Sequence, residues 1–494
     1  MSDRIDADGL RLPIKLDSTS NGEFWPRPLG RAARYANALA RQWTDANARR
    51  LGIGRRRFMI SACGAASTLL AFNEAFAAAG KTGGGYDLHA DAAFDPQLAA
   101  AKLSGDEFIF DVQGHYVNPR GAWVKKTPPP KGGIGWAPAS MPDSCPPERH
   151  PGDYGYLECI GPDAFIREVF LDSDTDMMVL SFVPSLRDAE PVTLAEAEVT
   201  RGIVERMEGG HRLLLHARTN PNQAGDLEGM EEVRGRWNIA AWKTYTQWGP
   251  DGRGFSLADE TIGIPFLEKV RRLGPRIVCV HKGIPFGKDS YEYSRCDDIG
   301  VVAKRYPDIA FLVYHSGFDP DVPERAFAPG ERRDGIDSFV QTILDNGIGK
   351  HSNVYAELGS TWRYLMRDPD GAAHALGKLV NAVGEDNVLW GTDSIWYGSP
   401  QDQIQAFRAF RIADALREKH GYPELTPQVK AKILGLNAAR VYGIDPPAAK
   451  QRAAGDAMSR ARAEYANDPQ PLFQTHGPRT RREFLALLST HPHR

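Results

Sequence analysis

The sequence predicts an α/β fold, specifically a (β/α)8 barrel, and three observations lead to it. Eight short apolar runs recur between residues 108 and 393, and helix-like segments separate them, as in parallel barrels. The runs are rich in Val, Ile, Leu and Phe without strict polar alternation, as expected of parallel strands covered on both faces. No dinucleotide-binding glycine fingerprint follows the first run, which disfavours the alternative fold, an open doubly wound sheet.

The expected strands and helices follow from these runs and from the periodicity between them. Strands are expected at residues 108–112, 177–182, 212–215, 237–242, 277–280, 309–314, 353–356 and 387–390. Amphipathic helices are expected at 194–207, 258–273, 336–344 and 372–383. The segment 116–176 after the first strand is too irregular for a crossover helix. We expect it to form a long inserted loop, with Trp123 and Trp136 over the barrel mouth.

Four segments make up the chain in this interpretation: a leader (1–79), a lead-in segment (80–107), the barrel (108–445) and a tail (446–494). Within the leader, Arg55-Arg56-Arg57-Phe58-Met59 and the Ala-rich stretch after it resemble a twin-arginine export signal. The resemblance implies export of the folded protein by the twin-arginine machinery and a periplasmic or extracytoplasmic location. The alternatives are a membrane-surface helix and a cytoplasmic protein.

Composition narrows the range of partners. The chain has 60 basic and 63 acidic residues and a formal net charge of -3, which gives no global argument for nucleic acid or membrane binding. No stretch after residue 80 is apolar for the roughly 18 residues that a spanning helix needs. We therefore expect a small-molecule substrate; a homo-oligomer remains open. Cys145 and Cys159 would pair in an oxidising compartment, whereas Cys279, within an apolar run, is expected to be a buried free thiol.

Polar residues that follow the apolar runs are the candidates for chemistry, because barrel active sites lie at the carboxyl ends of the strands. These residues are Gln113, His115, His216, Lys243, His281, His315, Glu357 and Asp393. A single histidine is more often held by local hydrogen bonds, but here several recur in register. Histidine and aspartate without cysteine suit one borderline divalent ion such as zinc. Such an ion would lower the pKa of bound water to roughly 7 or polarise a substrate carbonyl.

Four phrases resemble the amidohydrolase superfamily, and more narrowly its amidohydrolase-related (amidohydrolase 2) branch, which includes enzymes like aminocarboxymuconate-semialdehyde decarboxylase. They are Val280-His281-Lys282-Gly283, Tyr314-His315-Ser316-Gly317, Trp390-Gly391-Thr392-Asp393-Ser394 and Lys432-Ile433-Leu434-Gly435-Leu436-Asn437-Ala438-Ala439-Arg440. The resemblance covers residues 108–445.

The resemblance implies roles for individual residues. His115, His281 and Asp393 would be metal ligands, with Asp393 and His315 catalytic and His315 handling a proton or orienting water. The branch has Asp-x-His-x-His at its first strand, whereas this chain has Asp111-Val112-Gln113-Gly114-His115. Gln113 thus stands in a ligand position, and its amide oxygen is a weaker ligand than imidazole.

Further residues at the strand ends are candidate substrate contacts. Some superfamily members carry a carboxylated lysine at the position of Lys243, but an ordinary ammonium that binds a substrate carboxylate is the preferred interpretation, since the branch is mostly mononuclear. Arg218 has the two-pronged geometry that suits a carboxylate. The full set of expected substrate contacts is Lys243, His216, Arg218, Glu357 and Trp396. For His216 a structural role is equally open.

The leading hypothesis from the sequence is an exported metal-dependent hydrolase. Bound water would attack a C–N or C–O carbonyl bond of a small substrate, with aromatic compounds among the candidates. The alternatives are a non-oxidative decarboxylase of the same fold, a metal-free lactonase, and a binding protein that lost catalysis because Gln113 replaces a ligand. Fold alone does not choose among them.

Overall fold

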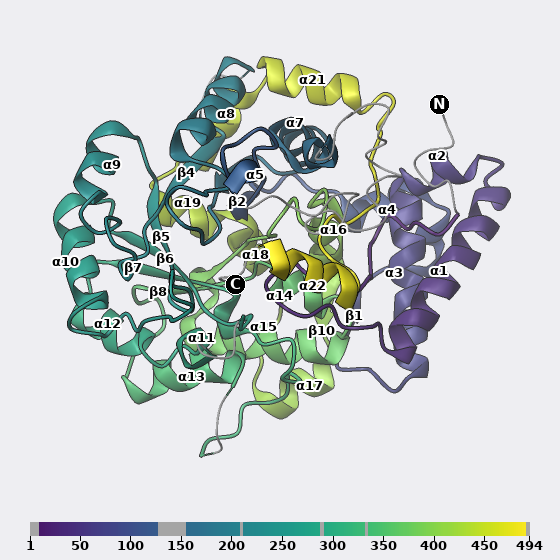
Figure 1. Cartoon of the computed structure of the whole chain (residues 1–494). Helices are drawn as coiled ribbons and strands as arrows, with labels where there is room; N and C mark the ends of the chain where they lie inside the picture. The colour runs from purple at the N-terminus through teal and green to yellow at the C-terminus, as the bar shows by residue number, and fades with distance from the viewer. Residues whose placement is uncertain (1–8, 127–154, 208–210, 287–290, 331–333, 491–494) are drawn as a thin grey trace.

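Eight parallel strands form the barrel in the computed structural model, which describes residues 9–126, 155–207, 211–286, 291–330 and 334–490 (Figure 1). Their order in the sheet is their order in the chain, β2 to β9. Hydrogen bonds from Val112 N to Trp390 O (3.0 Å) and from Asp393 N to Gln113 O (3.0 Å) connect the two edges. The (β/α)8 prediction is therefore confirmed. The strands are β2 Phe110–Gly114, β3 Met177–Leu180, β4 Leu213–Arg218, β5 Ala241–Tyr245, β6 Ile277–His281, β7 Ala310–Tyr314, β8 Val354–Glu357 and β9 Val388–Leu389.

Helices cover the outside of the barrel. In α10, Ile264, Leu267 and Val270 recur on one buried face, which is the pattern of an amphipathic helix. The helix ends before Gly274, whose φ of +58° few other residues adopt at low cost. Between the strands lie α5 Trp123–Lys126, α7 Pro162–Ile166, α8 Leu194–Met207, α9 Met230–Arg236, α10 Gly263–Leu273, α11 Tyr291–Ser294, α12 Ile299–Arg305, α13 Ile336–Asp345, α14 Thr361–Leu365 and α15 Pro369–Val383.

Two strands differ from the sequence prediction in a way that affects the site. The third and fourth runs were expected to end at residues 215 and 242, but β4 extends to Arg218 and β5 begins at Ala241 and extends to Tyr245. His216 and Lys243 therefore lie within strands and not after them. The prediction ended these two runs just before His216 and Lys243, whereas both of these side chains are completely buried.

The N-terminal segment packs against the barrel. Figure 1 shows α1 (Arg31–Arg50) and α3 (Ala62–Ala78) side by side, with α2 (Arg55–Met59) between them in the chain. Leu69 and Phe72 of α3 belong to the same buried apolar cluster as Phe407 of the barrel. Arg55 and Arg56 of the motif that resembles an export signal form ion pairs with Asp45 and Asp468. Export and cleavage of the leader remain predictions.

The lead-in segment and the chain after β9 complete the outer layer. The segment holds α4 (Pro96–Leu103) and β1 (Gly84–Tyr86), which pairs antiparallel with β10 (Phe410–Ile412). The later helices are α16 Gln401–Ala409, α17 Asp414–His420, α18 Pro427–Ala431, α19 Asn437–Tyr442, α20 Pro446–Ala453, α21 Ala457–Tyr465 and α22 Arg481–Thr490. No helix in the described ranges is both long and apolar enough to cross a membrane.

The inserted loop after β2 falls partly outside the described residues. Trp136 and Cys145 belong to the part that is not described. Trp123 is 1% exposed and packs in an apolar cluster with Leu157 and Phe165. Cys159 is disulfide-bonded, and its expected partner Cys145 lies outside the described residues. Cys279 is a buried free thiol, as predicted.

Candidate metal centre

The carboxyl ends of β2, β6, β7 and β9 bring five of the predicted residues together. His115 Nε2 lies 3.0 Å from Asp393 Oδ1, and Gln113 Nε2 donates to the same oxygen at 3.0 Å. Gln113 Nε2 also lies 3.5 Å from His315 Nε2. The His315 and His281 rings are 4.5 Å apart. Residues that are up to 280 positions apart in sequence thus form one polar cluster.

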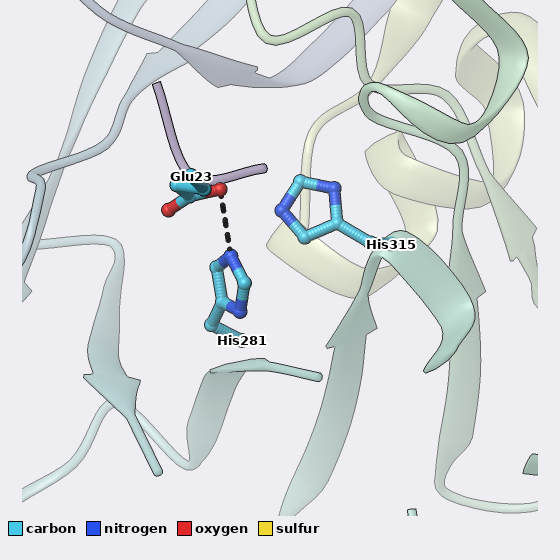
Figure 2. A group of neighbouring side chains, drawn as sticks. All are labelled: Glu23, His281 and His315. Atoms are coloured by element: carbon cyan, nitrogen blue, oxygen red, sulfur yellow. Dashed lines mark hydrogen bonds and ion pairs between the residues drawn. The ribbon is translucent and has the colours of Figure 1, made fainter. Parts of the chain in front are cut away.

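A sixth residue, which the sequence analysis missed, completes this cluster. Glu23 Oε2 lies 2.9 Å from His281 Nε2 (Figure 2). One ligand atom from each of Glu23, His281 and His315 lies within 4.8 Å of the other two. Glu23 belongs to residues 9–29, here called the N-terminal arm, which precede α1. The arm lies in the predicted leader and has no strand or helix periodicity, so no sequence signal placed Glu23 in the site.

The backbone at the site is held in an uncommon conformation. His315 and Asp393 have φ values of 64° and 61°, in the left-handed region that costs about 1–2 kcal/mol for residues other than glycine. The Glu357 carboxylate accepts hydrogen bonds from His315 N (2.9 Å) and Gly359 N (2.7 Å). Glu357 therefore stabilises the turn that carries His315.

Glycine is required at position 391 because the Glu357 carboxylate occupies the space of a side chain. A Cβ atom there would lie 1.6 Å from Glu357 Oε1. The phrase Trp390-Gly391-Thr392-Asp393 thus has a steric reason for its glycine, besides carrying the Asp393 carboxylate.

Hydrogen bonds determine which imidazole nitrogen faces the centre. His315 Nδ1 lies 2.6 Å from Gly359 O and donates to it, so Nε2 faces the cluster. Gln247 Nε2 donates to Gly283 O at 3.0 Å and lies 2.6 Å from His281 Nδ1. His281 consequently presents Nε2 to Glu23. Such outer contacts orient histidines in metal sites. Gln247 was also missed, although its position two residues after β5 fits the strand-end rule.

Burial and mutual contacts shift the pKa values of these groups. Burial lowers the pKa of His281, and burial together with His281 lowers that of His315 to about 3. Burial raises the pKa of Glu23, but His281 outweighs it and the pKa falls to about 2. For Asp393, likewise, contacts with His115 outweigh burial and the pKa lies below its ordinary value. Neutral imidazoles and ionised carboxylates are the forms that bind a cation.

The donor set fits a divalent ion. Its imidazole nitrogens and carboxylate oxygens are the ligands of borderline ions. Within the described part of the chain, Gln113 Oε1 and His115 Nδ1 are buried without a hydrogen-bond partner. Buried polar atoms usually have partners, so these atoms leave room for another polar group. The cluster is a candidate metal site.

Two of the expected substrate contacts lie beside the cluster. The Trp396 ring stacks on His115, with centroids 5.7 Å apart and planes 15° apart. The Lys243 ammonium lies 3.5 Å from the centre of the Tyr314 ring, and Lys243 Nζ has no hydrogen-bond partner among the described residues. Burial lowers the Lys243 pKa to about 8.

Two other expected contacts have protein partners. Arg218 forms ion pairs of 2.8 Å with Glu190 and with Asp226. His216 lies in the barrel interior, 3.2 Å from Ser181 Oγ and 3.2 Å from the Tyr442 hydroxyl. Neither residue contacts the His281 cluster through a hydrogen bond that involves described residues, and structural roles account for both positions.

The N-terminal arm covers this end of the barrel. His281 and His315 are completely buried, and Asp393 is 1% exposed. Asn21 Nδ2 donates to Asp393 Oδ2 at 2.8 Å and to Glu23 Oε2 at 2.6 Å. The C-terminal segment lies on the arm, since Ser20 N donates to Pro478 O at 2.9 Å. A substrate therefore has to reach the centre past the N-terminal arm and the C-terminal segment.

The model of one family, described as amidohydrolase, matches residues 227–444. This segment contains β5 to β9 and with them His281, His315 and Asp393. The matched part of the barrel is thus similar to amidohydrolases, in agreement with the resemblance seen in the sequence phrases. No curated protein matches the chain.

Solved structures that are similar to the chain include two decarboxylases and one candidate hydrolase. 5-Carboxyvanillate decarboxylase from Sphingomonas paucimobilis is 13% identical, and the match covers 69% of this chain and 100% of that chain with a TM-score of 0.40. 2,6-Dihydroxybenzoate decarboxylase from Rhizobium is 15% identical, and the match covers 68% of this chain and 99% of that chain with a TM-score of 0.39. A candidate 2-pyrone-4,6-dicarboxylic acid hydrolase from Pseudomonas putida is 12% identical, and the match covers 69% of this chain and 98% of that chain with a TM-score of 0.40.

Proposed function

We propose that this protein is a metal-dependent decarboxylase that releases carbon dioxide from a small aromatic or unsaturated acid. The observation that carries the proposal is Lys243. Its side chain is completely buried, and its ammonium has no hydrogen-bond partner in the described part of the chain. It interacts electrostatically with Glu357, Glu23 and Asp393 and is therefore close to the candidate centre. A buried ammonium that makes no hydrogen bond is costly, and a substrate carboxylate would accept one.

His115, His281 and Asp393 would hold the ion, with zinc the first ion to test and manganese the second. An ion there supplies positive charge that polarises an oxygen of the substrate. The low exposure of these side chains supports a reaction that proceeds away from bulk water. A desolvated site favours loss of a carboxylate, because it protects the carbanion-like carbon from unspecific protonation.

The proton required by the reaction would come from solvent and reach the substrate through His315. In decarboxylation the bond to the carboxyl carbon breaks, its electron pair stays on the substrate carbon, and a proton is added there. His315, whose Nδ1 donates to Gly359, has Nε2 free to pass a proton on. Trp396, stacked on His115, would form one wall for a flat substrate.

Hydrolysis is the second candidate, and the match of residues 227–444 to the amidohydrolase family favours it. In that reaction Asp393 and His315 would take the proton of the attacking water, and the carbonyl carbon would gain an oxygen.

The two reactions differ in the fate of isotopes. The full chain, loaded with zinc or manganese, is incubated with aromatic acids labelled with 13C in the carboxyl group and with lactones, esters and amides, all in 18O-water. We expect release of labelled carbon dioxide and no 18O in the organic product. An 18O-labelled acid without carbon dioxide would establish hydrolysis instead. If a chain that binds metal forms neither product, both reactions are refuted and the protein is a binding protein.

Two variants identify the residues. His315→Ala should lower kcat by at least about 100-fold, whereas His89→Ala, at an exposed histidine in the lead-in segment outside the barrel, should leave it unchanged. Lys243→Met should raise KM by about 10-fold or more for carboxylate substrates, the loss of one charged contact. An unchanged KM would show that Lys243 does not bind substrate.

A further inference from the structure

We infer that Glu23 is a metal ligand and that the N-terminal arm is a permanent part of the active site. This inference rests on the metal centre of the proposed function, and it goes beyond it by assigning a ligand from outside the barrel. Glu23 precedes His281 by 258 residues in sequence, yet its side chain contacts His281 directly in the described structure.

The first argument is geometric. Glu23 Oε2 lies 2.9 Å from His281 Nε2, and the ligand atoms of Glu23, His281 and His315 lie within 4.8 Å of one another. Figure 2 shows the Glu23 carboxylate and both imidazole rings directed to the same space. One cation in this space would contact the Glu23 carboxylate and the His281 imidazole, with His315 beside it.

The second argument is charge. Asn21 Nδ2 donates to Glu23 Oε2 at 2.6 Å and to Asp393 Oδ2 at 2.8 Å, so a single amide group connects two carboxylates. Glu23 is 7% exposed and Asp393 1%. Two buried carboxylates so close to each other repel and are costly to desolvate unless a positive charge lies between them. A divalent ion supplies that charge.

The third argument is what strand β2 offers. Its end presents the amide of Gln113 beside His115, and a neutral amide oxygen is a weaker ligand than a carboxylate. Gln113 instead donates to Asp393 Oδ1 through Nε2. Glu23 brings the anionic oxygen that the strand itself does not provide.

The fourth argument is that the arm is anchored on the N-terminal side of Glu23. Lys15 forms a buried ion pair with Asp402 (3.1 Å), and Asp17 forms a partly exposed ion pair with Arg363 (2.8 Å). Gly22 N donates to Ser20 Oγ at 2.9 Å within the turn that presents Glu23. A ligand needs this kind of support, because it must be held within a fraction of an ångström.

The competing possibility is that the arm blocks the centre and is removed on export. Cleavage after the leader would then free the barrel mouth. If Glu23 is a ligand, the same cleavage would instead take away part of the metal centre. The two possibilities predict opposite effects of changing Glu23.

The test uses the full chain and four variants: Glu23→Gln, Glu23→Asp, His281→Ala and, as matched control, Glu74→Gln at an exposed position of α3. Metal per chain and Kd for zinc are measured after dialysis, and the visible spectrum is recorded for the cobalt-loaded protein. Thermal unfolding of the metal-free forms shows whether each variant is folded. Turnover is measured separately.

We expect Glu23→Gln to weaken zinc binding by at least about 10-fold and to change the cobalt spectrum. The control Glu74→Gln should behave like the parent protein in both measurements. If Glu23→Gln does not fold, Glu23→Asp, which retracts the carboxylate by one methylene, should show the same direction. Unchanged Kd and cobalt spectrum in both Glu23 variants, with metal lost in His281→Ala, would overturn the inference and leave the proposed function standing. Raised turnover in Glu23→Gln would show that the arm blocks the site. If the parent protein itself binds no metal, the proposed function fails and the inference with it.

Discussion

Replacing Lys15 by methionine should release the N-terminal arm. Lys15 Nζ lies 3.1 Å from Asp402 Oδ2, and the two side chains are 7% and 2% exposed. Removing one partner of such a buried pair costs about 3–5 kcal/mol. Asp402 would keep hydrogen bonds from Lys15 N (3.1 Å) and Gln403 N (2.9 Å). Asp402 lies in the first turn of α16, where the helix dipole stabilises a negative charge, and this offsets up to about 1 kcal/mol of the cost.

The expected net loss is therefore about 3 kcal/mol, which corresponds to a roughly 150-fold larger population of the undocked arm. Hydrogen exchange of the arm amides measures this population. The control is Lys102→Met, which removes an ion pair with Asp87 whose side chains are 48% and 56% exposed and should cost less than about 1 kcal/mol. The reasoning would be refuted if the free energy of opening of the arm in Lys15→Met lies within about 0.5 kcal/mol of that in Lys102→Met.

Three further predictions concern the barrel mouth and its surroundings. Gly391→Ala should destabilise the protein by about 3 kcal/mol in thermal unfolding, since the added Cβ would displace the Glu357 carboxyl group, 1.6 Å away, and its two hydrogen bonds from backbone amides. Burial raises the pKa of Asp17, but Arg363, Arg479 and hydrogen bonds from Thr475 and Thr19 together outweigh it, and the pKa lies below its ordinary value. This contribution to stability is present above the unfolded pKa and is lost as the pH falls through the folded value, so arm protection should decline below about pH 4. Arg218→Met should lower the free energy of unfolding by about 3 kcal/mol and leave KM within about twofold, because both its ion pairs are structural.

Each of these has a control. Gly235→Ala, in α9 with no atom within 4 Å of the added Cβ, should be neutral or stabilise the helix by up to about 1 kcal/mol; equal losses in both glycine variants would contradict the steric argument. In Asp17→Asn the pH dependence of arm protection should become weaker and keep only the part that comes from Glu23. A raised KM with unchanged stability in Arg218→Met would return that residue to the substrate site, as the sequence analysis predicted.

Much of the fold could be predicted because it is written in local patterns. The helix expected at 194–207 is observed at Leu194–Met207, and all eight strands were expected within a few residues of their positions. Errors arose where a strand carries polar residues inward, as at His216 and Lys243. There the barrel interior overrides the local hydrophobic pattern, since burial of a polar side chain depends on partners from other strands.

The strand-end rule also found the core of the site. His115 and His315 directly follow their strands, His281 ends its strand, and Asp393 comes shortly after β9. Parallel strands in a barrel end at the same side. The rule could not show that Arg218 has two carboxylate partners, because Glu190 lies 28 residues away from it in an irregular segment.

The sequence by itself determined the barrel, the order of its strands and the histidines and aspartate at one end of it, because hydrophobic periodicity and strand polarity act over a few residues. Only the tertiary structure decided that Glu23 and Asn21 lie among them. Contacts over 258 and 372 residues bring these two side chains to the centre, through ion pairs and loop packing that leave no periodic signal. The free energy of docking an irregular segment is the sum of such scattered contacts, and no short stretch of sequence contains them.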